Sequence, residues 1–136
     1  MEDIIRKFQL IYTDLKREKG SFYVFMILKM DEFVNKWSIV VSAPWITKGN
    51  QNENFTYLVD KIKETLTLEE SSTIARLGIF QPDEHLIRLI NQSIRVDSGT
   101  PVRLENTKLN GYLIHEAYIF ESISLQDLNT MSPLSL

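Results

Sequence analysis

The stretch that decides the fold is Phe22-Tyr-Val-Phe-Met-Ile-Leu-Lys-Met30, an almost unbroken run of aromatic, branched and other apolar residues. It follows Gly20, is too short for a convincing helix, and its apolar positions do not alternate. These properties predict a β-strand that is covered on both faces. A second run, Trp37-Ser-Ile-Val-Val-Ser-Ala43, begins after a short polar turn and ends at Pro44. The short connection favours an antiparallel hairpin.

The segment before this hairpin predicts an amphipathic helix. Its apolar residues recur at helical spacing, and the charged residues fall largely on the other side. Acidic residues lie near its start and basic residues near its end, which suits the helix dipole, and Gly20 is a suitable C-cap. The apolar stripe consists of Ile4, Ile5, Phe8, Ile11, Tyr12 and Leu15.

After the hairpin, helical and extended patterns alternate. Two helices are expected in this part of the chain. One is capped by Asn54 or Thr56 and reaches Leu66, and the other has Pro82, Asp83 and Glu84 in its first turn. The expected strands cover 72–80, 102–105 and 112–121. The connecting segments are an exposed loop over 47–54 and turns over 97–101 and 106–111.

Together these elements predict a single α+β domain over residues 1–121, in the order α-β-β-α-β-α-β-β. We expect a mixed, mostly antiparallel sheet of about four to five strands packed against three amphipathic helices. Residues 122–136 are expected to form a tail or a short docked helix that starts near Ser124. No internal repeat or low-complexity linker divides the chain.

Composition excludes several classes of protein. The 136 residues include no cysteine, which removes disulfide frameworks, thiolate metal sites and cysteine nucleophiles and fits a reducing compartment. The formal net charge is −3, so we do not expect binding to nucleic acid, which normally needs a basic excess. No apolar run is long enough for a membrane span, and the amino terminus does not resemble a secretory signal. We therefore expect a cytoplasmic protein without contact to a membrane.

Catalytic and metal-binding motifs are scarce. The histidines are His85 and His115, and neither accompanies a G-x-S-x-G nucleophile motif. His85 follows two acidic residues in a helix start, where consecutive side chains point in different directions and do not converge on one ion. We therefore expect no metal and no cofactor. Whether the protein is an enzyme is left open, although the shortage of reactive groups favours a non-enzyme.

His115 is the more interesting histidine because it lies within an apolar strand, beside Glu116. Neighbours in a strand face opposite sides, so these two side chains are not expected to form an acid–base pair. His115 could join Arg103 or Glu105 across an adjacent strand. The interpretation we favour is a hydrogen-bonded histidine on a half-buried face.

The loop after the second strand, residues 45–54, is the candidate ligand site. It leads into a helix start, whose free backbone N–H groups and dipole attract anions. Lys48 would add charge, and Asn50 and Asn52 would add polar side chains. The segment has one glycine and matches neither phosphate-binding motif, so a solvated loop is the alternative. Trp45 suits a stacking platform, an interface anchor or a cap on the core.

Two hypotheses about function follow. The first is a binding or regulatory module that acts through a protein partner or self-association, and an inhibitor or immunity-type protein is one candidate of this class. The second is a small enzyme or sensor that binds an anionic ligand at loop 45–54.

Overall fold

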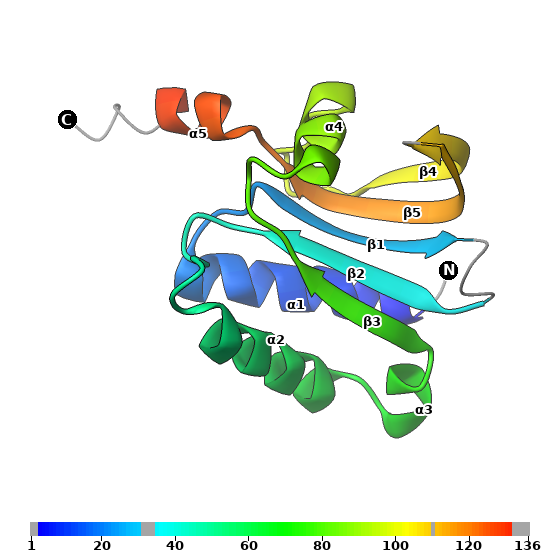
Figure 1. Ribbon diagram of the computed structural model, residues 1–136. Helices are drawn as coiled ribbons and strands as arrows, with labels where there is room; N and C mark the ends of the chain where they lie inside the picture. The colour runs from blue at the N-terminus through cyan, green and yellow to red at the C-terminus, as the bar shows by residue number, and fades with distance from the viewer. Residues whose placement is uncertain (1–2, 31–34, 110, 132–136) are drawn as a thin grey trace.

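The computed structural model describes residues 3–30, 35–109 and 111–131, and it confirms the α+β class (Figure 1). Two short helices are added to the predicted order of elements. Along the chain the elements are α1 (Asp3–Lys19), β1 (Val24–Met30), β2 (Trp37–Ser42), α2 (Gln51–Thr65), α3 (Leu68–Ser71), β3 (Ile74–Ile79), α4 (His85–Ser93), β4 (Val102–Leu109), β5 (Tyr112–Ser122) and α5 (Leu125–Met131).

The strands form one five-stranded sheet in the order β3-β2-β1-β5-β4. Neighbouring strands are antiparallel except β2 and β3, which are parallel. A parallel pair needs a long crossover, and here α2 and α3 provide it. The predicted hairpin of β1 and β2 is present, and β1 lies at the centre of the sheet.

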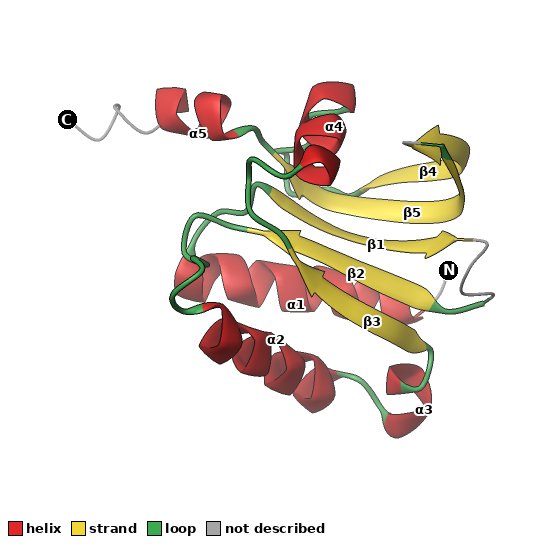
Figure 2. Ribbon diagram, in the orientation of Figure 1, coloured by secondary structure: helices red, strands yellow, loops and turns green. Residues whose placement is uncertain are grey.

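Helices cover the two faces of the sheet unequally. The longer helices α1 and α2 pack on one face, and α4 packs on the other (Figures 1 and 2). On the first face Phe8 and Leu15 of α1 meet Phe25 and Ile27 of β1. On the second face α4 contributes residues such as Ile87 to a smaller core. The nine residues of α4 leave part of this second face uncovered by a helix.

Helix α1 ends as the sequence predicts. Gly20 adopts a φ of +115°, and its N–H donates to the carbonyl of Lys16 over 2.9 Å. That backbone conformation favours glycine, which makes this a C-cap. None of the helices in the described part of the chain is long and apolar enough to cross a membrane.

The loop expected over 47–54 is shorter than predicted. Helix α2 begins at Gln51 with Asn50 as its N-cap residue, so the expected caps Asn54 and Thr56 lie inside the helix. The reason is local hydrogen bonding: Asn50 Oδ1 accepts from the N–H of Thr47 over 2.7 Å. Its amide also donates to a carbonyl upstream, and this turn directs the polar residues that follow into a helix.

Two other boundaries differ from the predictions. Helix α4 begins at His85 with Glu84 as its N-cap residue, so Pro82 lies in the preceding turn rather than in the first helical turn. Strand β4 continues to Leu109, through the expected turn over 106–111. Its pairing with β5 keeps the same register on both sides of Asn106, which adopts a φ of +48°, a conformation that asparagine tolerates. Residues 31–34 of the predicted polar turn after β1 lie outside the described residues.

The segment after residue 121 contains a helix. Strand β5 reaches Ser122, and α5 follows after Ser124, whose hydroxyl accepts from the N–H of Asp127 over 3.0 Å. Leu128 of α5 packs against the core on the α4 side of the sheet.

Candidate functional site

Trp45 caps the core. Its ring packs edge-on against Phe22, with the ring centroids 5.4 Å apart. Its Nε1–H donates to the carbonyl of Ser21 over 3.1 Å. Both contacts hold the indole against the start of β1, so the structure gives Trp45 a packing role.

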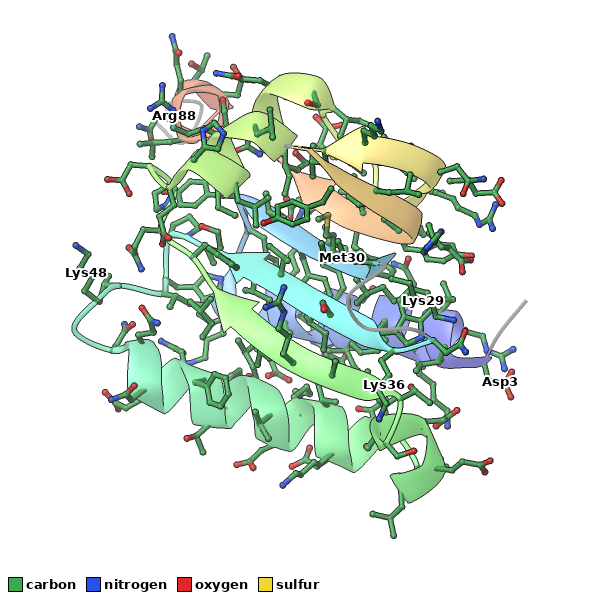
Figure 3. All side chains as sticks on the ribbon, turned by 45° about the vertical axis from the view of Figure 1, so that its right-hand side comes forward. Asp3, Lys29, Met30, Lys36, Lys48 and Arg88 are labelled. Carbon is green, nitrogen blue, oxygen red and sulfur yellow. The ribbon has the colours of Figure 1, made fainter. Side chains whose placement is uncertain are left out.

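The polar side chains of the 45–54 loop do not converge on one point. The Asn50 side chain bonds to Thr47 N and Trp45 O within the loop itself. Lys48 and Asn52 are exposed, and Figure 3 shows Lys48 pointing away from the body of the molecule. The loop therefore presents a single cation to a ligand, and its best-placed amide is already engaged.

Arg103 and His115 lie together on the hairpin of β4 and β5. The Arg103 guanidinium contacts Glu105 over 3.0 Å and Glu116 over 3.2 Å. Its Nε–H also donates to the hydroxyl of Tyr118 over 3.0 Å. The hydrogen bonds to Glu105 and Tyr118 raise the pKa of Arg103, and burial raises the pKa of Tyr118. The sequence suggested that His115 could join Arg103 across the strands, and the structure places both residues in the same part of this hairpin.

The expectation that His115 and Glu116 face opposite sides is wrong. The register of β5 against β1 shifts between Lys29 and Met30, because Lys29 pairs with Glu116 and Met30 with Ile114. His115 is the extra residue of this β-bulge, and a bulge interrupts the alternation of side chains. His115 is also exposed rather than half-buried.

As a result, His115 and Glu116 line the same cavity of about 350 Å³. Lys29, Arg103 and Glu105 also line it. Its formal charges balance, with two cations and two carboxylates, and both carboxylates contact Arg103. Because these carboxylates are already paired with Arg103 and the charges cancel, we interpret the cluster as a structural ion-pair network and not as an acid–base site. In the described ranges, no group of three or more histidine, aspartate and glutamate side chains is placed to hold a metal ion.

Sequence reasoning missed a different feature, the outer edge of β3. This strand has the sequence Ile-Ala-Arg-Leu-Gly-Ile, yet each of its six residues is at least partly exposed. In β2 beside it all six residues are buried. The difference arises because β3 ends the sheet (Figure 2). The apolar sequence signals a strand, but a single sequence cannot show that the strand lies at an edge.

Apolar side chains of α2 extend the surface beside this edge. A hollow of about 200 Å³ lies between α2 and β3, and Phe55, Val59, Ala75 and Leu77 are among its lining residues. Phe55 is 42% exposed. We call the edge of β3 and this hollow together the β3 edge surface.

Comparisons with family models, with curated proteins and with solved structures found no match to this chain.

Proposed function

We propose that the protein is a non-enzymatic binding module that acts by self-association, with the β3 edge surface as its contact. The supporting observation is that β3 combines an apolar sequence with partial exposure of every residue. An open, apolar strand edge is a template for pairing with another strand. The cytosolic location expected from the cysteine-free composition belongs to the same proposal.

The contrast between the two edges of the sheet supports this choice of surface. Strand β4 forms the other edge and carries Arg103, Glu105 and Lys108. Charged side chains of this kind protect an edge strand from pairing. Strand β3 carries one charge, Arg76, in its six residues. By this criterion β4 is protected and β3 is open to a partner.

The backbone of β3 has hydrogen-bonding groups directed outward. The N–H of Phe80 donates to the carbonyl of Val41 in β2 over 2.9 Å. Because directions alternate along a strand, the backbone of Gly78 also faces β2. The N–H and C=O groups of Leu77 and Ile79 then face away from the sheet. These groups are available to an added strand.

A second copy of the chain is the partner that best fits this edge. A two-fold axis through Leu77 would place its outward N–H and C=O groups opposite those of the second Leu77, as in a hydrogen-bonded antiparallel pair. In the same register Arg76 would lie opposite Gly78 of the second copy. The two guanidinium groups would therefore not face each other across the axis, and like charges directly opposite each other would disfavour pairing.

Light scattering coupled to size exclusion tests the proposal. At high micromolar concentration we expect a mass of twice the 15.9 kDa of the chain. Leu77→Lys should convert the dimer to a monomer, because it places two cations together at the axis.

The matched control is Leu104→Lys, which makes the same change in the other edge strand, β4. It should leave the dimer intact, and circular dichroism should show that both variants fold. A monomeric wild type at high micromolar concentration contradicts self-association. Equal effects of the two variants would show that the β3 edge surface is not the contact.

A further inference from the structure

The part of the second sheet face that α4 leaves open contains a groove of about 400 Å³. This volume is within the range of small-molecule sites, roughly 300–1,000 Å³. Its lining includes residues of α4 and of the hairpin of β4 and β5, which border the open face from two sides (Figure 1). The groove and the hollow between α2 and β3 lie on opposite faces of the sheet, so the two sites are separate.

The floor of the groove consists of buried apolar side chains. Met26 and Leu28 of β1 and Val40 of β2 are each at most 7% exposed. Alternate residues of a strand face the same side, so Met26 and Met30 lie on one face of β1. At a rise of roughly 3.3 Å per residue they are about 13 Å apart. The floor is therefore long enough for a molecule of about two fused rings.

The rim of the groove holds apolar and aromatic side chains that remain in contact with water. Phe80 and Leu86 come from α4 and the segment before it, and both are partly exposed. Leu109 and Tyr112 come from the hairpin of β4 and β5, and Tyr112 is 52% exposed. Single exposed apolar residues are ordinary on a protein surface, but here they surround one concavity. A ligand that covers them removes apolar surface from water, which favours binding.

The groove offers a ligand no uncompensated charge. Arg76 is the one charged side chain among the described residues of its lining, and it already takes part in another interaction within the protein. The hydroxyl of Ser38 is out of reach, because Ser38 is 2% exposed and its Oγ is buried. A charged ligand would lose hydration here without gaining a partner. The groove therefore selects a neutral molecule.

The residue types of the lining favour an aromatic ligand over an aliphatic one. Phe80 and Tyr112 contribute aromatic rings, and Met26 and Met30 contribute thioethers. Aromatic rings attract one another in edge-to-face or offset arrangements, and methionine sulfur makes favourable contacts with ring edges. An aliphatic ligand of the same size buries similar apolar surface but gains neither contact.

We infer that the groove binds a neutral aromatic small molecule of about two fused rings, which covers the floor between Met26 and Met30 and contacts the ring of Tyr112. 2-Naphthol is such a molecule at neutral pH. Titration with 2-naphthol at pH 7 tests the inference, because the ¹³C-methyl NMR signals of both methionines should shift and reach saturation.

Two analogues test the chemical class of the ligand. 2-Naphthoate has the same two rings with a carboxylate in place of the hydroxyl. Decahydro-2-naphthol has the same skeleton without aromatic rings. Both should bind more weakly than 2-naphthol, the first because its charge finds no partner and the second because it makes no aromatic contacts.

Variants test the place of binding. Leu86→Trp should reduce the affinity for 2-naphthol at least about tenfold, because the indole takes volume that the ligand needs. The matched control is Leu89→Trp, on the same helix at a partly exposed residue that is not among the described residues of the lining. It should leave the affinity unchanged. Tyr112→Ala should weaken binding roughly two- to tenfold through loss of the ring contact, and circular dichroism should show that each variant folds.

Four results would overturn the inference. Equal or tighter binding of 2-naphthoate would contradict the selection of a neutral ligand, and equal binding of decahydro-2-naphthol would contradict the aromatic class. Equal effects of Leu86→Trp and Leu89→Trp, with no effect of Tyr112→Ala, would place the ligand elsewhere. Methionine signals that respond to protein concentration but not to 2-naphthol would assign the groove to a second copy of the chain.

Discussion

A Cβ atom placed on Gly78 would lie 2.8 Å from Cε1 of Phe80. The ring of Phe80 therefore occupies the space that a side chain at Gly78 would need, and both residues line a cavity of about 400 Å³ on the α4 side of the sheet. We predict that Gly78→Ala destabilises the protein by roughly 1–3 kcal/mol, because the ring must move from its packed position. Chemical denaturation measures this change in the free energy of unfolding.

The contact between Gly78 and Phe80 also predicts how Gly78→Ala changes stability in a second background, the variant Phe80→Ala. In Phe80→Ala the obstructing ring is absent, so adding Gly78→Ala should be neutral or stabilising by about 0.4–1 kcal/mol, since alanine restricts the unfolded chain. If Gly78→Ala costs the same in both backgrounds, the Phe80 ring is not the reason for glycine at this position.

Glu121 connects α1 to the sheet from a fully buried position. Its carboxylate accepts from the Tyr12 hydroxyl, the Phe22 N–H and Lys16 Nζ, each over 3.1 Å. Glu121→Leu should cost about 2–3 kcal/mol, because it leaves the buried donors of Tyr12 and Phe22 unpaired. Tyr12→Phe should cost about 1 kcal/mol, since the carboxylate keeps two donors. A smaller cost of Tyr12→Phe in the Glu121→Leu background would establish the coupling, and strictly additive costs would refute it.

Asn106 has a positive φ in the middle of strand β4. Its positive φ is tolerated by asparagine, is ideal for glycine and is strained for a branched residue. We predict that Asn106→Gly is nearly neutral, whereas Asn106→Val costs about 1–2 kcal/mol. Thermal unfolding of the two variants gives the comparison. Equal stability of both would mean that the backbone conformation at this position is unimportant.

Stability should depend on pH through Glu70. Its hydrogen bond with Lys7, over 2.7 Å, is the main reason that its pKa lies below the usual 4.5. Between the two pKa values the unfolded chain binds more protons than the folded protein, so stability decreases on acidification in this window. The contribution is fully present above pH 4.5 and is lost as the pH falls through the native pKa of Glu70.

Replacing Lys7, the partner of Glu70, should reduce this dependence of stability on pH, while the hydrogen bonds from Thr67 remain. The difference in unfolding free energy between wild type and Lys7→Gln should shrink as the pH is lowered from 5.5 to 3. Lys63→Gln, a change at an exposed lysine of α2, should give a difference that stays constant over the same range. A constant difference for Lys7→Gln as well would show that the contact with Glu70 does not contribute.

The sequence predicted those features that depend on neighbours along the chain. The helical spacing of apolar residues from Ile4 to Leu15 identified α1, and the unbroken apolar run before Met30 identified a strand covered on both faces. These inferences succeed because a helix or a strand repeats its environment every few residues. The errors at Asn54 and Pro82 arose where the side chain of the N-cap residue, Asn50 or Glu84, accepts a hydrogen bond from the turn before the helix.

The surface proposed for self-association depends on strand pairing. The sequence alone does not show that β3 lies at an edge, nor that Arg76 is paired with Ser38. A one-residue shift at His115 reversed the expected relation to Glu116, because a bulge changes which side chains share a face. Sequence patterns determined the α+β class and the main elements of this protein, and only tertiary structure decided its edges and registers. The physical reason is that these depend on contacts between segments far apart in the chain.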